Sequence, residues 1–150
     1  MNQRLQGISR DIRESLRAIP YPIEEKDLEN IYNHVSHGRS IGFLEKARLE
    51  FLEELGFGEV WWRERHILLV VVEVRASYHR ELKQSPLFAT IDNVWFEDNE
   101  IVVTQRLFTH TKKLAVSATV HSACLHAEKK RAVEPPSLFV EAMRGLTEGR

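Results

Sequence analysis

The hydrophobic pattern of this chain changes its period near His66, and that change constrains the fold more than any other feature. Upstream, apolar residues recur every three or four positions over residues 40–55, as on one face of a helix. Downstream, apolar and polar residues alternate, as in strands with one buried face. The alternating runs cover residues 66–79, 87–96, 101–108 and 114–125. We therefore expect an α+β domain in which one long helix is followed by a meander of antiparallel strands.

The helix is expected from about Ser40 to Leu55, with Gly56 in the left-handed position that ends many helices. Arg48 falls among the apolar residues of its inner face, and Glu45 lies about 60° from Arg48 at the edge of that face. The apolar residues are Leu44, Ala47, Phe51 and Leu55. An apolar stripe this wide predicts that the sheet curls around the helix.

Two tight turns connect the expected strands. "EDNE" at Glu97–Glu100 places Asp98 and Asn99 in a hairpin turn, and "HTKK" at His110–Lys113 forms the next turn. A single sheet wrapped around one helix leaves an edge strand with unpaired backbone groups. Pairing between subunits covers such an edge, so the pattern favours a homodimer.

The two ends of the chain carry different signals. Residues 1–19 are expected to form an N-terminal helix that packs on the domain, on a neighbouring subunit or on a partner, and Pro20 and Pro22 end it. The apolar residues at helical spacing are Leu5, Ile8, Ile12, Leu16 and Ile19. At the other end, a charged turn and Pro135–Pro136 precede a short closing segment.

The composition fits one globular domain of 150 residues, 43% of them hydrophobic and 29% charged. The net charge of -1 provides no general attraction to nucleic acid or to an anionic membrane. Cys124 is the single cysteine, which excludes an internal disulfide and a cysteine-based zinc site. The first residues lack an apolar signal region, and the longest apolar run, Ile67–Val72, is too short to cross a bilayer. We expect a cytoplasmic protein.

Several catalytic motifs are absent from the sequence. It has no G-x-S-x-G elbow, no G-x-x-x-x-G-K-[ST] loop and no G-x-G-x-x-G turn, so it lacks the serine of the α/β-hydrolases and the usual phosphate cradles. Cys124 falls within an alternating run, where a small buried side chain is expected. His34 and His37 are three positions apart, yet no third metal ligand is evident. We expect neither a metal nor a cofactor.

Polar residues crowd the segment before the helix: Asn30, Asn33, His34, His37 and Arg39. With the helix that follows, this segment resembles the signature of the hotdog-fold acyl-CoA thioesterases of the 4-hydroxybenzoyl-CoA thioesterase group. "HVSH" at residues 34–37 fits their turn, and "FLEKAR" at residues 43–48 fits their helix. "VEVRASYHREL" and "KKRAVEPP" resemble a later strand and the closing segment of that family, so the resemblance covers about residues 21–140.

The resemblance implies a hotdog fold, in which an antiparallel sheet wraps one central helix and subunits pair edge to edge as homodimers, often as homotetramers. It also implies hydrolysis of an acyl-CoA or acyl-carrier-protein thioester at the subunit interface. The loop departs from the family in two places. Asn33 replaces a glycine, and asparagine tolerates the left-handed backbone better than most residues. Asn30 replaces an aspartate, and a carboxamide is not a useful base.

Three interpretations of the chemistry stay open. In the first, Glu45 is the base or nucleophile, as in the branch of the superfamily that carries a glutamate there. In the second, Asn30 and Arg48 orient water and thioester without a carboxylate, as in the enediyne-pathway hotdog thioesterases. In the third, the chain binds acyl groups without hydrolysing them. Glu45 and Arg48 also have a simpler interpretation, since residues three positions apart on a helix can pair beside the core.

The expected catalytic residues are therefore Asn30, His37, Glu45 and Arg48. The first N–H groups of the helix, at its positive end, form an oxyanion hole. Asn30 and His37 then fix the water or the carbonyl, and Glu45 accepts the proton. The substrate-binding candidates are His34, Ser36, Arg39, Arg80, Lys112 and Lys113, the last three for the phosphates of CoA or of a carrier protein.

There are two rival interpretations, one on the same scaffold and one on a different fold. A hotdog dehydratase or hydratase acts on a 3-hydroxyacyl or enoyl thioester, but its usual helix-start motif with histidine and an acidic residue is not matched here. A cone-shaped α+β ligand-binding domain is the alternative fold, and its usual helix count exceeds what this sequence offers.

Overall fold

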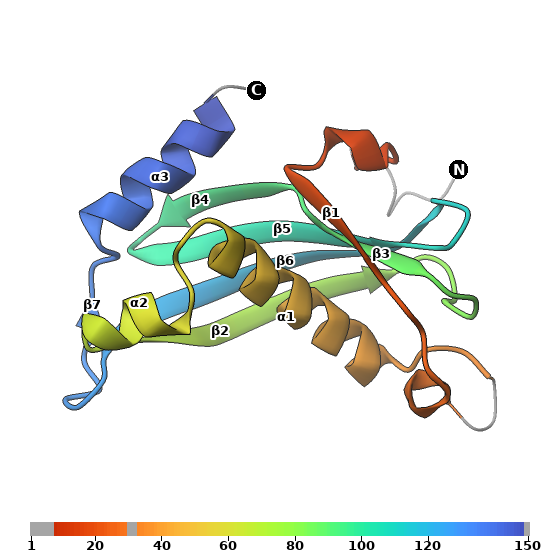
Figure 1. Cartoon of the computed structure of the whole chain (residues 1–150), viewed down its shortest axis with the longest axis horizontal. Coiled ribbons are helices and arrows are strands. Elements are labelled where there is room, and N and C mark those ends of the chain that lie inside the picture. Colours follow the sequence, from red (N-terminus) through yellow and green to blue (C-terminus); the bar gives the residue numbers. More distant parts are fainter. Residues whose placement is uncertain (1–7, 30–32, 149–150) are drawn as a thin grey trace.

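The computed structural model describes residues 8–29 and 33–148 and consists of one antiparallel sheet curled around a long helix (Figure 1). The helices are α1 (His37–Glu54), α2 (Glu59–Glu64) and α3 (Ser137–Glu148), with short 3-10 turns at Ile12–Glu14 and Glu25–Asp27. The strands are β1 (Arg17–Tyr21), β2 (Ile67–Tyr78), β3 (Leu87–Ile91), β4 (Asn93–Glu97), β5 (Glu100–Phe108), β6 (Leu114–His126) and β7 (Ala132–Val133). This is the α+β arrangement expected from the change of period.

The strands do not follow one another across the sheet as a simple meander does. Their order is β1-β3-β5-β6-β2, with β4 also paired to β5 and β7 to β6. The strand that follows the helices, β2, therefore lies at the far edge beside β6, and in the described part of the chain it pairs with β6 only. Alternation of apolar residues predicts strands but carries no information on their order, which explains why the meander expectation was incomplete.

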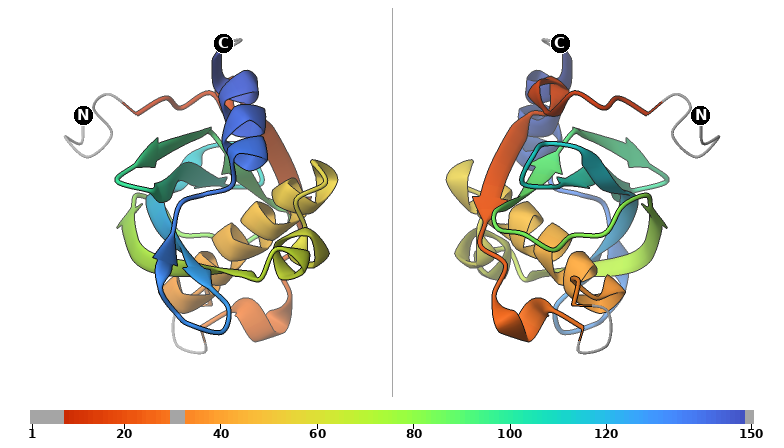
Figure 2. Two further views of the ribbon diagram at one scale, coloured as in Figure 1. Left: turned by 90° about the vertical axis from the view of Figure 1, so that its left-hand side faces the viewer. Right: turned by 90° about the vertical axis from the view of Figure 1, so that its right-hand side faces the viewer.

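Helix α1 begins three residues earlier than expected, because Ser36 caps it. The Ser36 hydroxyl accepts a hydrogen bond from the Arg39 N–H, so one of the free donors of the first turn is satisfied. The inner face of the helix, with Leu44 and Phe51, is buried against the sheet, which wraps around it in both views of Figure 2. Gly56 follows with φ +88°, the left-handed conformation expected of it.

A bulge in β2 changes which side chains face the helix. The pairing of β2 with β6 shifts between Val71 and Glu73, so one extra residue is inserted there. Leu69 packs on the core before the bulge and Ala76 after it, although an uninterrupted alternation would point them to opposite faces. The expected single apolar face running from Val70 through Tyr78 is therefore wrong in its first half.

The predicted N-terminal helix is also wrong where the structure describes it; residues 1–7 lie outside the described residues. Arg17–Tyr21 is strand β1, paired with β3, in which Ile19 and Tyr21 are buried and Pro20 is exposed. A proline is tolerated there because β1 is an edge strand. Pairing with β3 outweighs the helical spacing of the upstream apolar residues.

The C-terminal segment forms a full helix where a short segment was expected. Helix α3 lies over the end of the sheet beside β4 (Figures 1 and 2). Phe139 makes edge-to-face contacts with Phe57, Trp62 and Phe96. This aromatic cluster fixes α3 against α2 and the turn after α1. No helix in residues 8–29 and 33–148 is long and apolar enough to cross a membrane.

The expected turns between strands are confirmed. Asp98 and Asn99 connect β4 to β5 with φ values of 47° and 65°, as a two-residue hairpin turn requires. The next turn joins β5 to β6, and Lys112 has φ 63° in it.

Candidate functional site

Five of the predicted site residues line one of two cavities that follow one another along α1. His37 is the first residue of α1, and Glu45 lies eight positions later, about 12 Å along the axis at 1.5 Å per residue. Arg48 lies nearly a turn further on. Within one chain, the start of α1 and Glu45 therefore belong to different cavities.

The first cavity lies at the start of α1 and has a volume of about 240 Å³. It brings together three of the predicted residues, His34, His37 and Arg80, with the end of β2 forming the opposite wall. The ring of His37 stacks on that of Tyr78, with centroids 3.9 Å apart, and the Tyr78 hydroxyl donates to the His37 carbonyl at 3.4 Å. Burial raises the pKa of Tyr78, which keeps this hydroxyl protonated at neutral pH.

The loop that leads into this cavity is closed by short backbone contacts. The Glu29 N–H donates to the His34 carbonyl at 2.6 Å, and the Asn33 N–H donates to the Glu29 carbonyl at 2.8 Å. Asn33 has φ 53°, the left-handed conformation for which asparagine is suited. Asn30, another of the predicted catalytic residues, lies outside the described residues.

His34 lies between two carboxylates at the edge of this cavity. Its Nε2 is 3.6 Å from Glu29 and its Nδ1 is 3.7 Å from Glu81. Glu29 precedes the loop and Glu81 follows β2, so His34 connects the two segments that frame the cavity. This arrangement favours a role in positioning the loop.

The second cavity, of about 200 Å³, lies between α1, the sheet and α3. Glu45 and Arg48 line it from α1, and Ser122 lines it from β6. The remaining lining is apolar: Leu49, Phe51, Leu52, Leu69, Val71, Ile91, Val94, Ile101, Val103, Phe139 and Met143. A carboxylate and a guanidinium thus lie at the wall of a mostly apolar cavity, an arrangement typical of ligand sites.

Arg48 is fixed in this cavity by Gln105 of β5. Its Nη1 donates to the Gln105 Oε1 at 2.8 Å, and the Gln105 amide donates in turn to the carbonyls of Leu44 and Thr90, at 2.9 and 3.3 Å. Burial lowers the pKa of Arg48, and the charge of Glu45 opposes this effect. The Arg48 guanidinium stays charged, since arginine is protonated at any physiological pH.

Gln105 is the residue that the sequence-based prediction missed. It occupies an inward position of β5 between Val103 and Leu107, where alternation would place an apolar side chain. A polar residue at such a position was the available signal, because buried amides are retained where they have hydrogen-bonding partners.

The other predicted binding residues are more scattered. Ser36 caps α1 through its hydroxyl. Arg39 points to a separate groove, where its Nε is 3.9 Å from the buried Asp27 carboxylate. Lys112 and Lys113 are exposed on the turn between β5 and β6, at the same end of the molecule as the start of α1 (Figure 1). In residues 8–29 and 33–148, no cluster of three histidine, cysteine or acidic side chains is arranged to hold a metal ion.

Both cavities adjoin β2, the strand at the edge of the sheet. Tyr78 at the end of β2 faces the first cavity, whereas Leu69 and Val71 near its start face the second. Leu49 and Val71 remain 58% and 46% exposed at the rim of the second cavity. The edge of the sheet is therefore apolar beside the catalytic candidates.

Comparison with known proteins identifies relatives of this fold. Residues 25–143 match the pattern of the thioesterase-like superfamily. A hypothetical protein of Staphylococcus aureus, solved in complex with CoA, is 13% identical and superposes with a TM-score of 0.79 over 89% of this chain and 84% of that chain. A 1,4-dihydroxy-2-naphthoyl-CoA thioesterase of Synechocystis is 10% identical, with a TM-score of 0.75 over 84% of this chain and 93% of that chain.

YbaW of Escherichia coli, a probable thioesterase, is 23% identical, with a TM-score of 0.70 over 87% of this chain and 96% of that chain. No curated protein matches the chain in sequence. The likeness to the solved structures concerns the fold, and it confirms the hotdog arrangement that the resemblance implied.

Proposed function

We propose that this chain, which belongs to the thioesterase-like superfamily, hydrolyses acyl-CoA or acyl-carrier-protein thioesters to the free acid and the thiol. The observation that carries the proposal is the position of Glu45 and Arg48 at the wall of an apolar cavity on the central helix. An acyl chain needs such a cavity, and thioester hydrolysis needs a base beside the carbonyl.

The site is completed by a second copy of the chain. The edge strand β2 exposes backbone groups and apolar side chains, including Val71 and Val72. Antiparallel pairing of β2 with its copy about a two-fold axis places the end of one β2 beside the start of the other. Since His37 stacks on Tyr78, the start of α1 then approaches the cavity that contains Glu45 of the partner subunit.

This arrangement brings the start of α1 of one subunit close to Glu45 of the partner subunit. Within one chain, His37 and Glu45 are about 12 Å apart along α1. The N–H groups of the first turn of one helix receive the carbonyl oxygen as it becomes negative, and His37 beside them fixes the carbonyl or the water. Glu45 of the partner subunit takes a proton from water, whose oxygen attacks the carbonyl carbon. The C–S bond breaks, and the thiolate takes the proton back from Glu45.

Arg48 acts as a positioning residue in this scheme. Its bond to Gln105 anchors it beside Glu45, and the opposite charges of the two side chains attract each other. The carboxylate-free scheme with Asn30 and Arg48 remains the main alternative for the same reaction, and the variants below separate the two. Arg80, Lys112 and Lys113 are proposed to contact the phosphates of CoA or of the carrier protein. The cytoplasmic location and a tetrameric state stay predictions.

The test is an assay of the purified protein with a thiol reagent, using acyl-CoAs from acetyl to palmitoyl and benzoyl-CoA. Glu45→Gln is expected to lower kcat by about 10²- to 10⁴-fold, the usual contribution of a general base. Glu53→Gln is the matched control, because Glu53 is an exposed glutamate on the same helix that does not line the cavity. Loss of turnover in Asn30→Ala but not in Glu45→Gln would favour the carboxylate-free scheme.

A second candidate function is binding of acyl thioesters without turnover. The observation that favours it is Asn30, which replaces the aspartate of the related thioesterases. This candidate predicts that octanoyl-CoA binds in calorimetry and is not hydrolysed by the wild-type protein.

A further inference from the structure

We propose that the cavity between α1 and α3 is the acyl pocket, and that Met143 and Phe139 of α3 close it and limit the substrate to straight acyl chains of about six to eight carbons. The inference rests on the proposed function, because it assigns the substrate class of the same site. It adds a specificity role for α3.

The cavity has a charged end and a mostly apolar end. Glu45 and Arg48 lie at one end, and Leu52 follows them along α1 toward its C-terminus. Phe139 lies beyond Leu52, because it packs on Phe57 in the turn that follows α1. An acyl chain whose carbonyl lies at Glu45 therefore points with its methyl end toward α3.

The wall at the apolar end is closed and rigid. Phe139 and Met143 are fully buried, and Phe139 is held by edge-to-face contacts with Trp62 and Phe96 in addition to Phe57. Met143 takes part in none of these aromatic contacts, and its unbranched side chain can change conformation easily. A chain that exceeds the cavity must therefore displace Met143 first.

The volume sets the length of chain that fits. A cavity of about 200 Å³ accommodates about six or seven methylene groups, if each takes about the ~30 Å³ of a water molecule in the liquid. With the carbonyl carbon outside at Glu45, this corresponds to acyl chains of up to about eight carbons.

The lining of the cavity is mostly apolar, which suits the methylene groups of an acyl chain. Ser122 is the exception away from Glu45 and Arg48. It pairs with Ile101, which pairs in turn with Phe96, a contact of Phe139, so the Ser122 hydroxyl lies toward the α3 end.

The experiment compares acyl-CoAs of four to sixteen carbons and 4-hydroxybenzoyl-CoA. For the wild type, kcat/KM is expected to rise about fourfold per added methylene up to about eight carbons and to fall for longer chains. Met143→Ala is expected to move the optimum about two carbons longer, since three heavy atoms leave the wall. Val103→Phe, which fills the cavity from β5, is expected to lower kcat/KM for octanoyl-CoA about tenfold relative to butyryl-CoA.

Leu138→Ala is the matched control, because Leu138 is an exposed residue of α3 outside the cavity, and it is expected to leave the optimum unchanged. Thermal unfolding of each variant separates a shifted optimum from a misfolded protein. An optimum that is the same in the wild type, Met143→Ala and Val103→Phe would overturn the proposal, as would a preference for 4-hydroxybenzoyl-CoA.

A second readout keeps the pocket testable if no substrate turns over. Binding of octanoate and octanoyl-CoA is measured by calorimetry in the same variants. If the wild type shows no turnover but Val103→Phe weakens binding at least tenfold, the pocket is supported and the hydrolase function is contradicted. If the wild type shows turnover but none of these variants changes binding, the hydrolase function is supported and the pocket is contradicted.

Discussion

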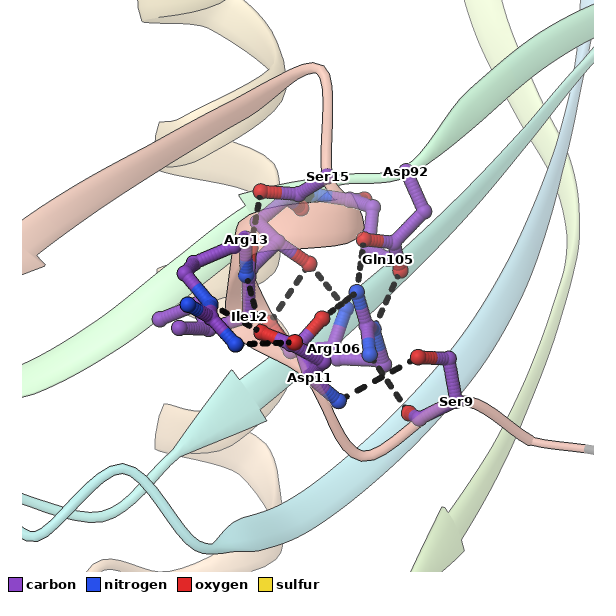
Figure 3. A network of polar contacts seen from close by, with 9 residues as sticks. Ser9, Asp11, Ile12, Arg13, Ser15, Asp92, Gln105 and Arg106 are labelled. Carbon is purple, nitrogen blue, oxygen red and sulfur yellow. Dashed lines mark hydrogen bonds and ion pairs between the residues drawn. The ribbon is translucent and has the colours of Figure 1, made fainter. Parts of the chain in front are cut away.

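The guanidinium of Arg106 and the carboxylate of Asp92 form a two-point ion pair on the outer face of the sheet, with N–O distances of 2.7 and 2.8 Å (Figure 3). The side chains are only 5% and 17% exposed. Gln105 faces α1, so the next residue, Arg106, points to the opposite face. There it also donates to the backbone carbonyls of Ser9 and Asp11, and it thereby holds the segment before β1 against the sheet.

Removing one partner of this pair is expected to be costly. Asp92→Ala leaves the buried charge of Arg106 without its counter-charge, so the free energy of unfolding is expected to fall by about 3–5 kcal/mol. Urea unfolding followed by tryptophan fluorescence measures it. Glu73→Ala, which breaks the exposed pair with Arg75, is the control and is expected to have a much smaller effect. Equal losses in the two variants would show that Asp92 does not stabilise Arg106.

Two glycines of the α1 region are expected to respond to alanine with opposite signs. Gly56 has φ +88°, so Gly56→Ala imposes strain and is expected to lower the free energy of unfolding by about 1 kcal/mol. Gly42 lies inside α1 with open space around its Cα, so Gly42→Ala is expected to raise it by about 0.5–1 kcal/mol. Denaturant midpoints of the two variants test this, and changes of the same sign would contradict it.

Cys124 is expected to be inert in the folded protein. Burial raises the pKa of its thiol to about 11, so at pH 8 only about one molecule in a thousand carries the reactive thiolate. A thiol reagent is therefore expected to react with Cys124 in urea but not under native conditions. Rapid labelling of the native protein at pH 8 would contradict this and would compromise the thiol-based assay.

The same shift makes a prediction for alkaline stability. The folded-state pKa of about 11 lies above the ordinary value of 9.0, so the protonated thiol favours the folded state. This stabilisation is fully present below pH 9 and is lost as the pH rises from 9 to 11. The free energy of unfolding should therefore fall more steeply over this range in the wild type than in Cys124→Ala. Parallel pH profiles would show that the thiol does not contribute.

The helix and most strands could be predicted from the sequence because their periodicity is set by burial against one sheet. The order of the strands and the position of β2 at the edge could not, because pairing partners leave no mark on a single alternating run. The bulge after Val71 also made part of the predicted apolar face wrong. One inserted residue shifts the alternation by one position, so the residues before the bulge face the side opposite to the one predicted.

The sequence identified individual candidate residues of the site but not how they are arranged in space. Arg48 stands out as an arginine on an apolar helix face, whereas Glu45 is predicted as the base from the family resemblance; both residues line a common cavity. Their distance from His37 follows from helix geometry, whereas the partner Gln105 is 57 positions from Arg48 in sequence. Contacts of that kind depend on the packing of β5 against α1, which local patterns do not specify.

Mixed dimers test whether His37 of one subunit works with Glu45 of the other. His37→Ala and Glu45→Gln are each expected to be nearly inactive as homodimers, because both sites then lack one residue. In a mixed dimer, one site combines the intact His37 of one chain with the intact Glu45 of the other, and the second site lacks both. Doubly tagged mixed dimers are therefore expected to recover about half of the wild-type kcat per dimer, since one of two sites is whole.

The alternative geometry predicts a different result. If His37 and Glu45 of the same chain form one site, every site of the mixed dimer lacks one residue and no activity returns. A mixture of Glu45→Gln with Arg48→Ala is the control, because both residues line the same cavity of one chain. Each cavity of that mixed dimer lacks one of them, so it is expected to stay as inactive as its parents. Recovery in this control would show that Arg48 acts with Glu45 of the other subunit and not with Glu45 of its own chain.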